Sequence, residues 1–179
     1  MYRVGGLFSG VGGIELGFEL AGDYEISWAN ELDKNACVTY RANFNHRLYE
    51  KDIHKLSGKE LKSVDVLVGG FPCQAFSVAG YRKGFSDPRG NLFFEIARLI
   101  EELSEKPKAL LLENVKNFFT HDGGNTFKVV QNTLGELGYS VFPHILNTSQ
   151  LTDIPQNRER TFIICFRDES GWNFFPEGT

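Results

Sequence analysis

The stretch Val66-Leu-Val-Gly-Gly-Phe-Pro-Cys-Gln-Ala-Phe-Ser77 decides the fold expected for this chain. Its β-branched, apolar beginning, from Val64 to Val68, predicts a buried strand of a parallel sheet. The two glycines allow the backbone to turn sharply or to lie close to a ligand. Open α/β sheets bind their ligands at the carboxyl ends of the strands. Cys73 is therefore either a reactive thiol presented from a rigid turn or a small buried core residue.

Composition indicates a single globular domain spanning 1–179. Hydrophobic residues make up 41% of the chain and charged residues 23%, which is typical of a folded segment. No apolar run reaches the roughly 18 residues of a membrane helix, so no membrane partner is expected. Three widely spaced cysteines fit neither a disulfide framework nor a metal site, which indicates a reducing cytoplasm. With a net charge of −4, any nucleic acid must be held by local basic groups or by another polypeptide.

Strands and helices alternate along the whole chain, which predicts an α/β, doubly wound, mostly parallel sheet. The first expected strand, Arg3 to Phe8, runs into Phe8-Ser-Gly-Val-Gly-Gly-Ile14 and then into a helix that stops at Gly22. Such a join places free backbone N–H groups beside whatever binds there. The glycines match a dinucleotide fingerprint only loosely, so a nucleotide-like site and a plain tight turn both remain open.

Carboxylates follow three of the expected strands. The strand Tyr24 to Ala29 leads to Glu31, which lies 21 residues after Gly10, near the spacing of a ribose-binding acid. Glu31 or Asp33 can equally serve the start of the helix expected over Lys34 to Asn43. A third strand is expected to end at Asp52-Ile53, and Ala109 to Leu112 to deliver Glu113 to the same rim. The alternatives are an exposed loop acid for Asp52 and a core-edge glutamate for Glu113.

The second half of the chain continues the pattern. The glycine-bearing loop from Val78 to Asn91 is typical of a lid beside a site. Arg158 and Arg160 alternate at strand spacing, so both can point the same way. Cys37 and Cys165 are interpreted as core residues. The remaining elements expected are helices from Leu92 to Leu103 and from about Phe127 to Leu137, and strands from Ser140 to Leu146 and Thr161 to Phe166.

Five short segments, FSGVGG, NELDK, GGFPCQAFS, ENV and QNRER, occur in this order along the chain. Together they resemble the cytosine-C5 DNA methyltransferase family of the bacterial restriction–modification type, over essentially the whole chain. The resemblance implies a Rossmann-like fold of the S-adenosylmethionine-dependent methyltransferases. It also implies methyl transfer from S-adenosyl-L-methionine to C5 of a cytosine flipped out of double-stranded DNA, without a metal. The implied location is the bacterial cytoplasm, in association with the nucleoid.

The resemblance further implies residue roles. In catalysis, Cys73 would be the nucleophile that adds to C6 of the base. Glu113 would bind the N3 and N4 edge of the base and Arg160 its O2. Arg158 and Asn114 would support the site. For the cofactor, Phe8, Gly10 and Gly12 would line the pocket. Glu31 would bind the ribose hydroxyls and Asp52 the adenine amino group. The residues that would pack around the adenine are Ile53, Pro72 and Leu92. Leu32 departs from the family, whose members often have an aromatic residue there.

Members of that family normally continue with a variable target-recognition region and a final conserved segment, and neither is found in residues 1–179. The chain is therefore expected to be an incomplete catalytic and cofactor-binding domain. A complementary polypeptide that carries the target-recognition region is one candidate partner. A split subunit, a truncated piece and a gene fragment remain alternatives. The rival functions are an RNA cytosine-C5 methyltransferase and a catalytic subunit that is inactive alone.

Overall fold

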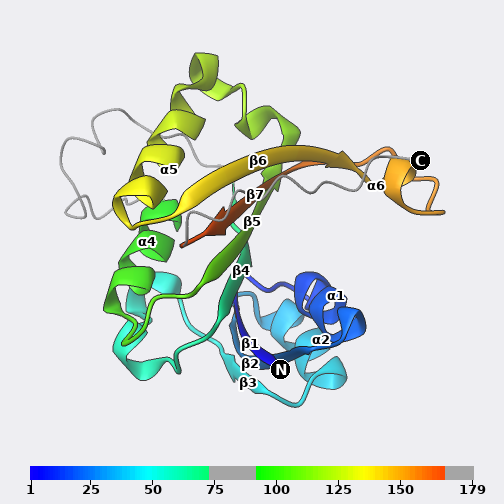
Figure 1. Ribbon diagram of the computed structural model, residues 1–179. Coiled ribbons are helices and arrows are strands. Elements are labelled where there is room, and N and C mark those ends of the chain that lie inside the picture. Colours follow the sequence, from blue (N-terminus) through cyan, green and yellow to red (C-terminus); the bar gives the residue numbers. More distant parts are fainter. Residues whose placement is uncertain (73–91, 168–179) are drawn as a thin grey trace.

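The structure is a computed structural model that describes residues 1–72 and 92–167. A seven-stranded sheet in the order β3-β2-β1-β4-β5-β7-β6 runs through it (Figure 1). The strands are β1 (Tyr2–Leu7), β2 (Tyr24–Asn30), β3 (Arg47–Tyr49), β4 (Val66–Gly70), β5 (Ala109–Val115), β6 (Ser140–Asn147) and β7 (Glu159–Phe166). The helices are α1 (Gly13–Ala21), α2 (Lys34–Asn43), α4 (Leu92–Glu102), α5 (Asn125–Glu136) and α6 (Thr148–Leu151), with short 3-10 turns between them.

The order of the strands reverses between β1 and β4. All neighbouring strands are parallel except that β7 is antiparallel to both β5 and β6. In open α/β sheets, ligands bind outside the carboxyl ends of the strands at such a reversal. The prediction of a doubly wound, mostly parallel sheet is confirmed, and the topology indicates where a site belongs.

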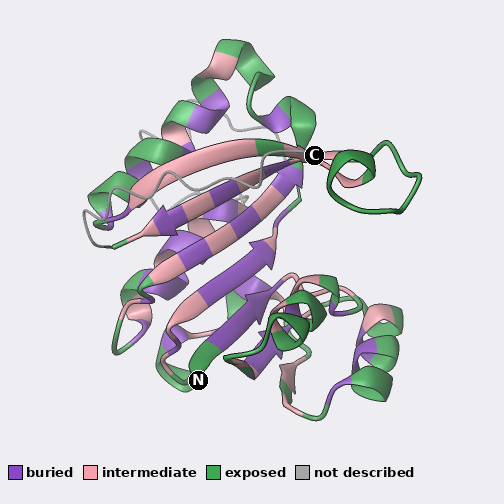
Figure 2. Ribbon diagram, turned by 45° about the vertical axis from the view of Figure 1, so that its right-hand side comes forward, coloured by how far each residue is buried: buried purple, intermediate pink, exposed green. Residues whose placement is uncertain are grey.

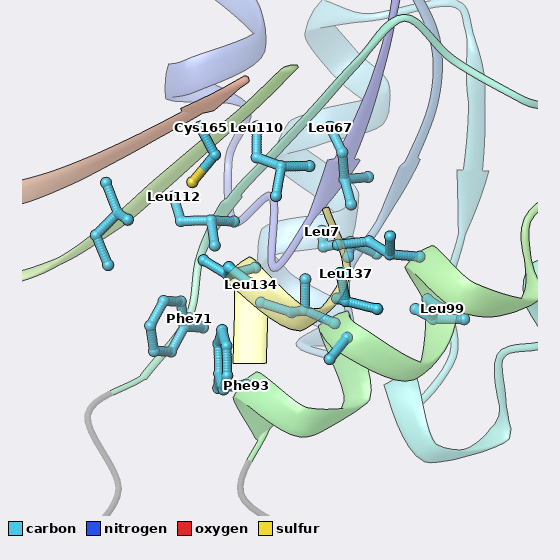
Figure 3. Close-up of a cluster of buried hydrophobic side chains, with 14 of the residues drawn as sticks. Leu7, Leu67, Phe71, Phe93, Leu99, Leu110, Leu112, Leu134, Leu137 and Cys165 are labelled. Atoms are coloured by element: carbon cyan, nitrogen blue, oxygen red, sulfur yellow. The ribbon is translucent and has the colours of Figure 1, made fainter. Parts of the chain in front are cut away.

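The main hydrophobic core lies between the sheet and the helices α4 and α5. Alternate residues of the central strands, among them Leu67, Leu110 and Leu112, are fully buried there and point toward α4 in Figure 3. Cys165 of β7 belongs to this core, and Cys37 is buried on α2, so both are core residues as expected. This packing fixes the central strands, whose carboxyl ends carry the polar residues of interest.

The opposite face of the sheet is covered unevenly. Helix α1 packs over β1, β2 and β4, whereas in Figure 2 no described helix lies in front of β5, β7 and β6. Leu111 and Phe162, on this face, are only half-buried. Together with Ile14, Phe18 and their neighbours on α1 they border an open groove of about 450 Å³. A largely apolar sheet face is thus left accessible beside α1.

Several of the expected strand bounds were wrong. β4 spans Val66–Gly70 and not Val64 to Val68, so both glycines belong to the strand, and β7 begins two residues earlier than expected, at Glu159. β3 is only three residues long, and Asp52 does not end it but caps a 3-10 turn over Ile53–Lys55. β5 does not stop before Glu113 but continues to Val115, because β7 pairs with it as far as Arg160. Glu113 therefore lies within a strand. The helix expected over Lys34 to Asn43 has those bounds in the structure.

Asp65 joins the amino ends of three central strands. Its Oδ2 accepts a hydrogen bond from the backbone N–H of Arg3 at 3.0 Å, and its Oδ1 lies 3.0 Å from Nζ of Lys108. Its backbone carbonyl accepts from the N–H groups of Lys108 and Ala109. The hydrogen bond from Arg3, followed by that from Lys108, lowers the pKa of Asp65 from 3.8 to about 2. The carboxylate form is therefore the one that stabilises the fold.

Replacing Asp65 with Asn is expected to lower the free energy of unfolding at pH 7 by about 1 kcal/mol, since the exposed Lys108 is screened by solvent. A depressed carboxyl pKa contributes stability above the unfolded value and loses it as the pH falls toward the folded value. The wild-type protein should therefore lose this contribution between pH 3.8 and about 2, and Asp65→Asn should not. Urea unfolding over this range measures it, with the exposed Asp153→Asn as control. Parallel pH profiles of wild type and Asp65→Asn would contradict the interpretation.

Candidate active site

A left-handed turn joins β1 to α1 at the switch point of the sheet. Phe8, Gly10 and Gly12 have φ angles of 54°, 55° and 95°, a region that glycine enters at little cost and that strains phenylalanine. A Cβ atom on Gly12 would lie 2.1 Å from the ring of Phe44. The backbone at Gly12 therefore has room for no side chain, and the turn brings bare main chain to the ends of β1 and β4.

Glu31 anchors this turn from the end of β2. Its Oε2 accepts a hydrogen bond from the N–H of Gly10 at 2.7 Å, and its Oε1 accepts from the N–H groups of Leu32 and Asp33 at 2.8 Å. Asp33 in turn caps α2, because its side chain accepts from the N–H of Ala36. Since each carboxylate oxygen can accept about two hydrogen bonds, Oε2 retains one acceptor position for a ligand hydroxyl.

A cavity of about 560 Å³ opens beside Glu31, within the size range of small-molecule sites. Its lining consists of Phe8, Asn30, Glu31, Leu32, Asp33, Lys34, Lys51, Asp52, Ile53 and Leu92. Most of the cofactor contacts expected from the sequence are therefore brought together in one place. Gly10 and Gly12 lie in the adjoining turn, while Pro72 is exposed after β4 and is not part of the lining.

Asp52 lies at the wall of this first cavity, held by its neighbours. Its Oδ1 accepts from the backbone N–H of His54 at 3.1 Å and contacts the His54 Nδ1 at 2.8 Å, and these hydrogen bonds lower the pKa of Asp52. Arg98 of α4 fixes the adjoining 3-10 turn, because its Nη2 donates to the carbonyls of Ile53 and Leu56 at 2.9 Å. Asp52 is therefore an ionised acceptor on a fixed wall.

Asn30 supports the same wall and was missed by the sequence reasoning. The side chain is buried, and its Nδ2 donates to the carbonyls of Tyr49 and Lys51 at 2.8 Å each. The signal that could have found it is an amide at a strand end, directly before Glu31. The lining of the first cavity thus combines carboxylate acceptors, Glu31 and Asp52, with apolar side chains, a set that fits the hydroxyls, ring and exocyclic amine of an adenosine group.

A second cavity, of about 420 Å³, adjoins the turn through Ser9 and Val11. The Nε of Arg160 lies 3.0 Å from Oε1 of Glu113, an ion pair between β7 and β5 in which both side chains are about three-quarters buried. A Cβ atom on Gly70 would lie 3.2 Å from Oε2 of Glu113, so the missing side chain leaves room for the carboxylate. Arg158 lines the same cavity, and the two arginines thus face one site, as their spacing predicts.

Asn114 fixes the segment that leads to Cys73. Its side chain is 2% exposed, and its Nδ2 donates to the carbonyl of Phe71 at 2.9 Å. The Phe71 ring packs against Phe93 and Phe118 at centroid distances of 5.7 and 5.5 Å, and Figure 3 shows Phe71 and Phe93 together at one end of the core. Cys73 itself and the lid expected over Val78 to Asn91 lie outside the described residues.

The two described cysteines are poor candidates for a reactive thiol. Burial raises the pKa of both Cys37 and Cys165, and a thiol needs an accessible, electropositive setting to react. Among residues 1–72 and 92–167 there is no cluster of three histidine, cysteine or acidic side chains that could hold a metal ion. In the same part of the chain, no helix has the length and apolar character required to span a bilayer.

The domain is Rossmann-like, and a cavity whose lining suits an adenosine group and a second, polar cavity adjoin one glycine turn. The family model for C-5 cytosine-specific DNA methylase matches residues 2–179, and the chain belongs to this family. It is 51% identical over 169 residues to the type II methyltransferase M.Bsp6I of Bacillus sp. (strain RFL6), covering 94% of the chain and 53% of that protein. It is 48% identical to M.HhaI of Haemophilus parahaemolyticus, covering 91% and 48%.

Solved structures agree on the fold. The S. pombe Dnmt2 methyltransferase superposes with a TM-score of 0.79 at 26% identity, over 96% of the chain and 53% of that structure. A putative DNA modification methyltransferase from an E. coli prophage superposes with a TM-score of 0.73 at 28% identity, over 93% and 47%. The chain spans about half the length of the curated relatives it matches.

Replacing Gly12 with Ala is expected to distort the turn, whereas Gly13→Ala should be tolerated. Gly12 has a left-handed φ and meets the Phe44 ring, but a Cβ on Gly13 meets nothing within 4 Å. The left-handed strain and the overpacking together should destabilise Gly12→Ala by roughly 2–4 kcal/mol. Urea unfolding measures the loss, and Gly13→Ala is the matched control. Equal stabilities of the two variants would refute this account of the turn.

Proposed function

We propose that residues 1–179 form an incomplete catalytic and cofactor-binding domain of a DNA (cytosine-5-)-methyltransferase, which transfers a methyl group from S-adenosyl-L-methionine to C5 of a flipped-out cytosine. The observation that carries the proposal is the Glu113–Arg160 ion pair in a cavity that shares the glycine turn with the nucleoside cavity. A methyl donor in the first cavity and a base in the second would be neighbours. Membership of the C-5 cytosine-specific DNA methylase family supports the same function.

In this proposal the nucleoside cavity takes the adenosyl part of the cofactor. The remaining acceptor position on Glu31 binds a ribose hydroxyl, and the ionised Asp52 accepts from the adenine amino group. Gly10 and Gly12 keep the turn free of side chains beside the methionyl part. Phe8 lines the cavity, and the residues proposed to pack around the adenine are Ile53, Leu92 and, two residues after β4, Pro72. When bound, S-adenosyl-L-methionine supplies an electrophilic methyl group and leaves as S-adenosyl-L-homocysteine.

The second cavity is proposed to hold the base. Cytosine C5 is a poor nucleophile until the Cys73 thiolate adds to C6, which makes a sulfur–carbon bond and an electron-rich C5. Glu113 shares a proton with N3 as negative charge builds on the ring, and Arg160 donates to O2. Once C5 carries the methyl group, loss of its proton to a base breaks the sulfur–carbon bond and returns the thiolate. Asn114 orders the Phe71 backbone before Cys73, and Arg158 supports the rim of the cavity.

The proposed macromolecular partners are double-stranded DNA and a complementary polypeptide. The base must leave the helix to reach such a cavity, and with a net charge of −4 the chain offers little general attraction for DNA. We therefore assign target recognition and the final conserved segment of the family to polypeptide outside residues 1–179. The open apolar groove between α1 and Phe162 supports this, since apolar surface of that kind is commonly covered. The proposed location is the bacterial cytoplasm, with the nucleoid.

A covalent trap tests the proposal. The chain is mixed with S-adenosyl-L-methionine and DNA duplexes that contain 5-fluorocytosine, with and without the carboxyl-terminal half of the Bacillus relative. Fluorine replaces the hydrogen at C5, so no C5 proton can be lost and the covalent adduct persists. Intact mass and peptide mapping are expected to find a Cys73–base adduct, with more of it when the second polypeptide is present. Glu113→Gln should reduce its yield at least tenfold, in line with loss of a general acid–base group.

Three controls sharpen the trap. Cys73→Ala should give no adduct, while Cys37→Ala should leave the yield unchanged because that thiol is buried. An RNA duplex with 5-fluorocytosine runs in parallel, and an adduct on RNA alone would replace DNA with RNA as the substrate. Absence of any adduct in the presence of the second polypeptide would refute the enzyme proposal.

A further inference from the structure

Glu15 is a carboxyl group in an unusual setting. It lies in the first turn of α1, is 1% exposed, and its Oε2 has no hydrogen-bond partner among the described residues. The sequence pattern gives Glu15 no role. Burying an ionised carboxylate without partners is costly, so its presence beneath the glycine turn requires an explanation.

The strand beneath Glu15 is shaped to receive it. A Cβ atom on Gly6 of β1 would lie 2.0 Å from Glu15 Oε1 and 2.7 Å from Ser9 Oγ. The carboxyl and the hydroxyl therefore lie together over the same point of β1. Ser9 Oγ is also buried without a partner in the described part of the chain, although the residue borders the second cavity. Glu15 Oε1 and Ser9 Oγ thus approach the same point of β1, while Glu15 Oε2 and Ser9 Oγ lack hydrogen-bond partners among the described residues.

The surroundings favour the neutral form of this carboxyl. Burial is the largest effect and raises the pKa of Glu15, and the negative charges of Glu31 and Glu19 raise it further, while the Ser9 hydroxyl opposes them. Tyr40, facing from α2, stays neutral because burial raises its pKa, and its hydroxyl lies 2.6 Å from His46 Nε2. The two charges that raise the pKa of Glu15, those of Glu31 and Glu19, are both negative.

We propose that Glu15 is a positioning residue: its neutral carboxyl donates a hydrogen bond to Ser9 Oγ and so holds the turn from Phe8 to Gly12 in its left-handed form. Glu31 holds the same turn from the other side, through the N–H of Gly10. When Glu15 loses its proton, the donor disappears and a second negative charge is buried near Glu31. The turn then loosens as the carboxylate seeks water, and cofactor affinity falls. The link to the cofactor rests on the proposed function, whereas the link to the turn does not.

Hydrogen exchange of the turn decides the proposal. Exchange of residues 8–13 is followed in the full chain from pH 5 to pH 9 and corrected for intrinsic rates. In the wild type, protection should be greatest at low pH and fall by up to about tenfold per pH unit once Glu15 ionises, the limit for one proton. Glu15→Gln, which is neutral at every pH, should keep its protection throughout. Glu25→Gln, an exposed change on β2, should retain the wild-type dependence.

Ser9→Ala keeps the test decisive if Glu15→Gln folds poorly, because it removes the acceptor and leaves the carboxyl in place. It should lower protection at pH 5 to the level that the wild type reaches at pH 9. Identical pH profiles in the wild type and Glu15→Gln would overturn the proposal. So would loss of protection in Glu15→Gln at every pH, which would mean that the ionised form is the one required.

Calorimetric titration with S-adenosyl-L-homocysteine over the same pH range extends the test to the cofactor. Affinity is expected to follow the exchange protection in the wild type and to be independent of pH in Glu15→Gln. A wild-type affinity that does not change with pH would contradict the proposed effect of Glu15 on cofactor binding. If none of the proteins binds at any pH, the proposed function fails, and hydrogen exchange still decides whether Glu15 holds the turn.

Discussion

The close approach of β1 and β4 is the constraint on which the rest of the structure depends. Leu7 pairs with Gly69, and a Cβ atom at Gly69 would lie 2.9 Å from the Leu7 carbonyl oxygen. Without a side chain at that position the two strand ends meet directly. The turn that follows Leu7 then adjoins the Phe71 segment at the end of β4. Both cavities adjoin that turn, so their placement relative to one another depends on one glycine contact.

Buried amides and partly exposed carboxylates have different roles around this contact. Asn30 and Asn114 donate their side-chain N–H groups to backbone carbonyls, which fixes the walls of the cavities. Glu31 and Asp52 keep acceptor capacity toward a cavity after satisfying backbone donors. Neutral amides suit the dry interior because burying a satisfied dipole costs less than burying a charge. Charge is placed where a ligand or Arg160 can balance it.

Much of this arrangement could be predicted from the sequence, because it depends on local pattern. The helix over Lys34 to Asn43 and the meeting of Arg160 with Glu113 at one rim followed from periodicity, strand ends and the family resemblance. The continuation of β5 past Glu113 could not be predicted, since it depends on pairing with β7 far along the chain. Glu15 was missed because a charge in a helix suggests solvent. Only the space over Gly6 explains its burial.

The position of β7 also determines when the site can form during synthesis. β7 lies between β5 and β6 in the sheet although it follows both in the chain. Until residues 159–166 emerge, β6 has no neighbour to join, and the edge of β5 stays open. Arg160 arrives with this strand, so Glu113 has no arginine partner on a nascent chain. Closure of the sheet and completion of the ion pair are therefore one late, long-range step, of the kind that slows folding.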